Sequence, residues 1–157
     1  IAEFLTATNQ TEGIKEYGLN AFTLNILDKR RTMLEKLVSL IRFSYAKNPT
    51  AELVKKIRHF YDLYYLTKDQ DCMKYLQSPK FKTDLEELLA YDQQAFDEQK
   101  GWQTKTIKDS PLISNFSELW KDLHSTYQNE LTPLAYSEIP NEKLIEESFI
   151  ATIKRTI

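Results

Sequence analysis

The sequence predicts a mainly α-helical bundle with one short β-strand near its N-terminus. Most of the 157 residues fall in stretches where apolar side chains recur every three or four positions, the spacing of one helix face. Only residues 22–26, Phe-Thr-Leu-Asn-Ile, alternate apolar and polar side chains as a half-buried strand does. The whole chain has three glycines and five prolines, so few positions force a helix to break.

Residues 1–28 are expected to stand apart from this bundle. Residues 1–7 have the pattern of a helix end, and a polar connector follows them. The strand predicted at residues 22–26 needs a neighbour for its backbone N–H and C=O groups, and no second strand is evident. Either residues 1–6 pair with it, or its sheet lies outside this sequence. The absence of an initiator methionine agrees with the second alternative, so we expect a connector and an edge strand of a missing N-terminal core.

Residues 29–157 are expected to form a helical C-terminal domain. Its first helix is predicted at residues 32–46, where Thr32 and Glu35 have the spacing of a capping box. The helix should end before Pro49, which pushes the preceding residue out of the α region. A polar loop is predicted at residues 97–113, and further helices are predicted at residues 50–67, 69–77, 79–96, 114–131 and 141–156.

Composition limits the classes of protein to which the chain can belong. With 41% hydrophobic and 28% charged residues it is ordinary for a folded domain and unlike a disordered chain. The single cysteine, Cys72, excludes an internal disulfide, so a reducing, cytoplasmic location is expected. No apolar stretch approaches the ~18 residues that a membrane-spanning helix needs, so no membrane partner is expected.

Charge is distributed unevenly along the chain. The net charge is −2, but residues 29–58 carry nine lysines and arginines against two acids, a balance of +7. The segments before and after have balances of −3 and −6. A basic segment inside an acidic chain is the first indication of an anionic partner such as a nucleotide or RNA.

Two parts of this basic segment could carry chemistry. Lys36 lies at the edge of an apolar helix face, where it either lays its stem on apolar surface or projects its ammonium group into a cleft. Arg58 and Asp62 are i,i+4 neighbours on the next helix. They either form a salt bridge on a solvated face, or Asp62 orients a basic group or shares in a metal or phosphate site. The sequence contains no glycine-rich phosphate loop and no metal-ligand spacing.

Read together, these motifs resemble a known family. The run Phe-Thr-Leu-Asn-Ile-Leu at residues 22–27, Arg31-Thr32 with Glu35-Lys36, and Arg-His-Phe-Tyr-Asp-Leu at residues 58–63 are similar to the C-terminal half of AbiEii/AbiGii-type nucleotidyltransferases. That family is a branch of the DNA-polymerase-β-like superfamily. The resemblance covers residues 20–66 well and the later helices with lower specificity.

The resemblance implies the transfer of a nucleotide from an NTP to an acceptor, of which tRNA is one possibility. It also implies a toxin or phage-defence protein. It implies Lys36 and Asp62 as catalytic residues, and Lys36, Arg31 and Arg58 as nucleotide-binding residues. It also implies an RNA acceptor and an antitoxin protein as partners. Phosphoryl-type transfer depends on positioning and on cations that offset charge at the phosphates, which a +7 segment can supply.

One departure from the family pattern concerns metal. The family's Gly-Gly-Ser/Thr turn and its Asp-x-Asp strand, which carry the metal ions, are missing, and Asp69-Gln70-Asp71 stands in the wrong order and context. We therefore expect Mg²⁺ in the full-length enzyme with its ligands outside this chain, and an inactive fragment on its own. The alternatives are a non-enzymatic helical module that binds a partner or antitoxin, and a standalone RNA-binding helical domain.

Overall fold

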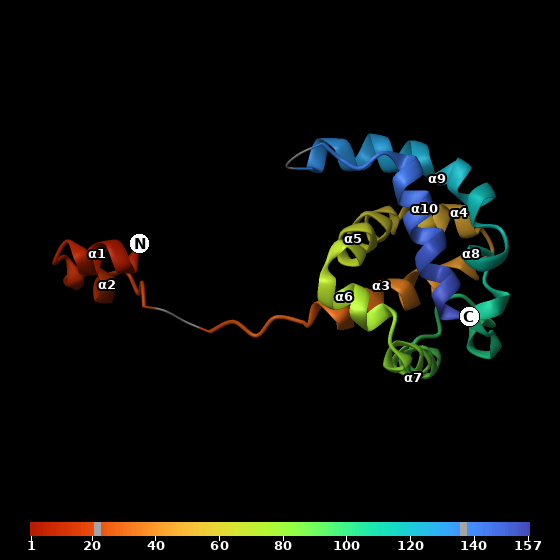
Figure 1. The fold of residues 1–157 in the computed structure, drawn as a ribbon, viewed down its shortest axis with the longest axis horizontal. Coiled ribbons are helices and arrows are strands. Elements are labelled where there is room, and N and C mark those ends of the chain that lie inside the picture. The colour runs from red at the N-terminus through yellow and green to blue at the C-terminus, as the bar shows by residue number, and fades with distance from the viewer. Residues whose placement is uncertain (21–22, 136–137) are drawn as a thin grey trace.

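The fold is seen in a computed structural model, which describes residues 1–20, 23–135 and 138–157 (Figure 1). It is mainly helical, as predicted. In chain order the α-helices are α1 (Ala2–Ala7), α2 (Thr11–Glu16), α3 (Lys29–Ser44), α4 (Pro49–Val54), α5 (Ile57–Lys68), α6 (Gln70–Leu76), α7 (Pro79–Ala95), α8 (Pro111–Ser114), α9 (Phe116–Leu131) and α10 (Glu142–Ile153). Short 3₁₀ turns lie at η1 (Trp102–Thr104), η2 (Ile107–Asp109), η3 (Thr132–Leu134) and η4 (Lys154–Thr156).

The predicted strand at residues 22–26 is wrong for the residues that the structure describes. Residues 23–28 are irregular and no strand is found in the described part of the chain, while Phe22 lies outside it. The physical reason is the lack of a neighbour, because an extended segment becomes a strand only when another strand takes up its backbone hydrogen bonds. Leu24 and Ile26 are 70% and 86% exposed, so the alternating pattern has no core to face.

Helices α1 and α2 contact each other and bury none of their residues. Figure 1 shows them at the far end of the segment that leads into α3. The helices from α3 onward instead share a single hydrophobic core. Helices α1 and α2 therefore add nothing to that core, and the domain division at residues 1–28 and 29–157 stays a prediction.

Helix α3 is the central element of this core. It packs against α4, α5, α6, α7 and α8 and buries most of its apolar side chains. It begins earlier than predicted, because Asp28 is the N-cap and its carboxylate accepts a hydrogen bond from the Arg30 backbone N–H. The predicted capping box at Thr32 is therefore wrong, and the Thr32 hydroxyl instead donates to the Asp28 carbonyl within the first turn.

The single helix predicted at residues 50–67 is two helices, α4 and α5. Between them, the Lys56 N–H donates to the Leu53 carbonyl and the His59 N–H to the Lys56 carbonyl. These three-residue spacings tighten the chain into a turn and change its direction. As a result α4 packs on α3 and α9, whereas α5 packs on α3, α6, α9 and α10. The ends of α6, α7 and α9 lie within two residues of their predicted positions.

An aromatic cluster holds α5 in place from behind. The Phe60 ring lies 4.9 Å from Phe149 of α10 and 5.7 Å from Phe116 of α9, centroid to centroid. Trp120 of α9 meets the same ring edge-on at 5.4 Å. One side of α5 is thereby fixed against α9 and α10, which leaves another side for α3. Among the described residues, no helix is long and apolar enough to cross a membrane.

Candidate functional site

Lys36 and Asp62 meet where α3 and α5 pack together. The Lys36 ammonium donates to the Asp62 carboxylate at 2.7 Å, and the two side chains are 20% and 26% exposed. Of the two placements that the sequence left open for Lys36, the contact with Asp62 agrees with the one in which the ammonium group projects into a cleft. The structure thus brings together the two residues that the resemblance implies as catalytic, and their catalytic role stays a prediction.

The pair opens into a pocket of about 650 Å³, here called the α3–α5 pocket. Helix α3 contributes residues spaced by about one turn, and α5 contributes two tyrosines and a leucine beside Asp62. Its volume lies within the ~300–1,000 Å³ typical of small-molecule sites. The residues that line it are Lys29, Thr32, Lys36, Tyr61, Asp62, Tyr65, Leu66 and Asp69.

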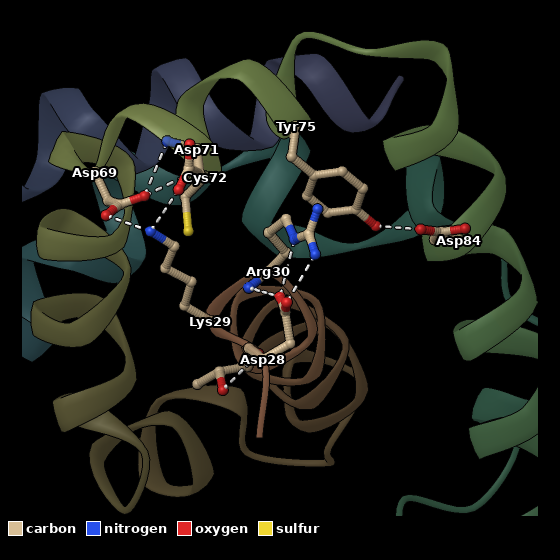
Figure 2. A network of polar contacts seen from close by, with 9 residues as sticks. Asp28, Lys29, Arg30, Asp69, Asp71, Cys72, Tyr75 and Asp84 are labelled. Atoms are coloured by element: carbon tan, nitrogen blue, oxygen red, sulfur yellow. Dashed lines mark hydrogen bonds and ion pairs between the residues drawn. The ribbon is translucent and has the colours of Figure 1, made fainter. Parts of the chain in front are cut away.

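A second ion-pair network joins the start of α3 to the start of α6 (Figure 2). Two of its members, Lys29 and Asp69, line the α3–α5 pocket. Lys29 donates to Asp69 at 2.8 Å and to Asp71 at 2.9 Å. Asp69 is also the N-cap of α6, and it accepts hydrogen bonds from the Asp71 and Cys72 backbone N–H groups. The Lys29 hydrogen bond is the main cause that lowers the pKa of Asp69 to about 2. Asp69 is therefore a carboxylate at neutral pH and fixes the Lys29 ammonium at the pocket.

Arg31 lies in a different pocket. Its guanidinium donates to Glu35 at 2.8 Å, and it lines a pocket of about 610 Å³ between α3 and α7, here called the α3–α7 pocket. Positions 31 and 36 are about 140° apart around a helix, so they face opposite neighbours of α3. The structure does not bring Arg31 to Lys36. The α3–α7 pocket also contains Arg30, Tyr75, Lys80, Asp84 and Tyr91.

Arg58 is exposed, and it is not among the residues that line the α3–α5 pocket. The ion pair between Arg58 and Asp62, one of the two alternatives that the sequence left open, is not formed among the described residues. Asp62 bonds to Lys36 of a neighbouring helix instead. Packing of α3 on α5 places a cation directly at the carboxylate, whereas Arg58 remains on the solvent side, so the tertiary partner replaces the local one.

His59 follows Arg58 on α5 and lies close enough to Lys36, Lys56 and Asp62 to feel their charges. Burial, then the positive charges of Lys36 and Lys56, lower the pKa of His59 to about 4, while Asp62 acts in the opposite direction. At neutral pH its imidazole is uncharged. It therefore adds no positive charge to the site.

Sequence reasoning also missed the tyrosines, Lys29 and Thr32. Thr32 and Lys29 precede Lys36 by four and seven positions, and Tyr65 follows Asp62 by three. Residues at these spacings share a helix face. The same helical periodicity that marked Lys36 could have found Lys29, Thr32 and Tyr65 once Lys36 and Asp62 were taken as centres, whereas Tyr61 is adjacent to Asp62 and has no such spacing.

The described residues do not fit a magnesium site. No group of three or more His, Cys, Asp or Glu side chains in residues 1–20, 23–135 and 138–157 is placed to hold a metal ion. Both carboxylates of the α3–α5 pocket are already bonded to lysines. Asp69 and Asp71, the Asp-x-Asp string of the sequence, hold Lys29.

Comparison with protein families gives the class of this chain. Residues 2–147 match the family described as "Nucleotidyl transferase AbiEii toxin, Type IV TA system". Since the match covers nearly the whole chain, the chain belongs to the AbiEii nucleotidyl transferase toxin family. No curated protein and no solved structure matches it. The resemblance seen in the motifs around Lys36 and Asp62 is confirmed.

Proposed function

We propose that this chain binds the nucleotide in an enzyme that transfers a nucleotide from an NTP to an acceptor, with Lys36 and Asp62 in the active site. The observation that carries this proposal is the Lys36–Asp62 bridge between α3 and α5, which opens into a pocket large enough for a nucleotide. Membership of a nucleotidyl transferase family supports the reaction type.

In this reaction an acceptor oxygen attacks the α-phosphorus of the NTP. The bond from that phosphorus to the bridging oxygen breaks, and pyrophosphate leaves with the bond electrons. Negative charge on the phosphates must be offset, which the Lys36 ammonium does from the pocket wall. Asp62 holds that ammonium in place, because a charge-assisted hydrogen bond of 2.7 Å fixes the end of a flexible side chain. Lys29, held by Asp69 and Asp71, adds a second cation at the same pocket.

The family's use of a divalent metal leads to a second part of the proposal. Because the carboxylates at this site are bonded to lysines, we propose that the Mg²⁺ ligands come from residues outside the described ones, in a core to which residues 1–28 belong. The exposed apolar side chains of Leu24 and Ile26 support an additional packing partner for that segment. An upstream reading frame with an Asp-x-Asp strand after a Gly-Gly-Ser/Thr turn would support this part, and a start codon directly before Ile1 would contradict it.

An RNA acceptor, such as the 3′ end of a tRNA, and an antitoxin partner complete the proposal. The basic segment at residues 29–58 supports the RNA, because lysines and arginines attract a phosphate backbone. The family description, a toxin of a type IV toxin–antitoxin system, supports the antitoxin.

The test is nucleotide transfer by the complete gene product, followed with α-labelled NTPs and an RNA pool. We expect Lys36→Ala and Asp62→Ala each to slow transfer by ~100-fold or more, about 2.7 kcal/mol of transition-state stabilisation. Far-UV circular dichroism should show that both variants stay folded. Lys80→Ala is the matched control, since Lys80 lines the α3–α7 pocket with a side chain 73% exposed. Transfer rates that are unchanged in both pocket variants would refute the assignment.

A further inference from the structure

Three tyrosines follow one another along α5, and they have different surroundings. Tyr61 and Tyr64 are partly buried and pack against the hydrophobic core. Tyr65 is 45% exposed. Its ring lies 4.9 Å from Tyr61 and 5.3 Å from Tyr64, centroid to centroid. Tyr65 is thus an exposed ring supported from behind by two others, which gives it a defined position without burying it.

This ring borders the proposed nucleotide site. Tyr61 and Tyr65 line the α3–α5 pocket together with Lys36 and Lys29, and Leu66 adds further apolar surface. One wall of the pocket is therefore aromatic and apolar, while the α3 wall carries the ammonium groups. An NTP has the same division, because its base is a flat aromatic ring and its phosphates are anionic.

We propose that Tyr65, backed by Tyr61, is the wall on which the base of the bound nucleoside triphosphate stacks while Lys36 holds its phosphates. This inference rests on the proposed function and names the part of the same site that receives the base. Every base has a π-face, so stacking alone discriminates weakly between bases. The wall therefore supplies affinity for a nucleoside, and the choice among the four NTPs has to come from other contacts.

The competing explanation is that the tyrosines have only a structural role. The two explanations can be distinguished by comparing a ligand that has a base with one that has none. Inorganic tripolyphosphate carries the phosphates without a base. Binding of ATP and of tripolyphosphate to the complete gene product can be measured by isothermal titration calorimetry, for the parent and for Tyr65→Leu, Tyr65→Phe and Lys36→Ala. Tyr91→Leu is the matched control, since Tyr91 is an exposed tyrosine of the α3–α7 pocket.

We expect Tyr65→Leu to raise the Kd for ATP about tenfold, ~1.4 kcal/mol, and to leave the Kd for tripolyphosphate within about twofold. Tyr65→Phe should keep ATP affinity, because the ring and not the hydroxyl stacks, and Tyr91→Leu should change neither Kd. Lys36→Ala should weaken both ligands.

The two hypotheses fail differently. Unchanged ATP binding in Tyr65→Leu, or equal weakening of both ligands, would overturn the stacking role while leaving Lys36 in place. Unchanged binding of both ligands in Lys36→Ala would overturn the proposed function itself.

Discussion

The α3–α5 and α3–α7 pockets flank the same N-terminal turns of α3 and invite comparison. They have similar volumes, about 650 and 610 Å³, and each is lined by cations, carboxylates and two tyrosines. By composition alone they would be equivalent candidates for an anion site. They differ in how their charges are paired.

In the α3–α7 pocket the charges pair with near neighbours in the sequence. Arg31 bonds to Glu35 and Lys80 to Asp84, each four positions away, and Arg30 bonds to Asp28. Figure 2 shows Arg30 turned onto Asp28 while the adjacent Lys29 reaches Asp69 and Asp71. Such local, exposed pairs contribute little and form on any solvated helix face.

In the α3–α5 pocket the partners are far apart in the sequence. Lys36 and Asp62 are 26 positions apart, and Lys29 is 40 and 42 positions from its two aspartates. These bonds exist only because α3, α5 and α6 pack together, and they hold ammonium groups at a common cavity. The comparison teaches that a basic segment does not locate a site, whereas long-range pairing at a pocket does.

The largest expected effect comes from removing the Phe60 ring, which packs α5 against α9 and α10 on the side away from the α3–α5 pocket. Phe60→Ala should lower the free energy of unfolding by about 3–5 kcal/mol, because it leaves a cavity among Phe116, Trp120 and Phe149. Urea unfolding measures this. The control Phe60→Leu keeps most of the volume and should cost less than about 1.5 kcal/mol. A loss below about 1 kcal/mol in Phe60→Ala would show that the α3–α5 pocket does not depend on this cluster.

Acid should destabilise the protein through His59. Its pKa is about 4 when folded against 6.5 as the ordinary value, so the unfolded state binds more protons between these pH values. Stability should therefore fall as pH is lowered from about 6.5 to about 4, by at most ~3 kcal/mol. His59→Gln should remove that part of the pH dependence in unfolding curves recorded across this window. An identical slope in the variant would mean that His59 is not held uncharged beside Lys36.

The smallest expected effect is a difference in coupling free energy between one ion pair from each pocket, measured by double-mutant cycles. Coupling between Lys36 and Asp62, tested with Lys36→Met and Asp62→Asn, should be about 1–2 kcal/mol because the pair is largely shielded from solvent. Coupling between Arg31 and Glu35, whose side chains are 45% and 44% exposed, should be only ~0.3–0.5 kcal/mol. Equal couplings would remove the distinction between the two pockets.

Several features of the fold were predictable from the sequence because they depend on near neighbours. Helical periodicity located α6, α7 and α9 to within two residues. Asn48 lies outside both neighbouring helices because the following Pro49 disfavours the α region for it, although α3 already ends at Ser44. Where two local signals compete, prediction failed. Both Asp28 and Thr32 can cap a helix, and Asp28 is the cap in the structure, where its carboxylate accepts from the backbone N–H and from the side chain of Arg30.

The candidate site likewise has one feature that the sequence predicts and one that depends on tertiary packing. The placement of Lys36 at the edge of an apolar face follows from spacing, since a helix turns by a fixed angle per residue. The identity of the residue that pairs with Asp62 does not follow from spacing. Within α5 the i,i+4 rule favours Arg58, and only the packing of α3 across α5 puts the Lys36 ammonium closer.

The N-terminal segment shows most clearly what local sequence cannot predict. Alternation at residues 22–26 encodes a preference for an extended conformation with one apolar face, and residues 23–28 are without regular structure. A strand also needs a second strand to accept and donate its backbone hydrogen bonds, and local sequence cannot supply that neighbour. Helices carry their hydrogen bonds within themselves, so spacing along the chain was enough to find α6, α7 and α9, although α2 lies where a polar connector was predicted and the predicted helix at residues 50–67 is two helices. Ion pairs, pockets and strands join distant parts of the chain, so they arise only when those parts are folded together.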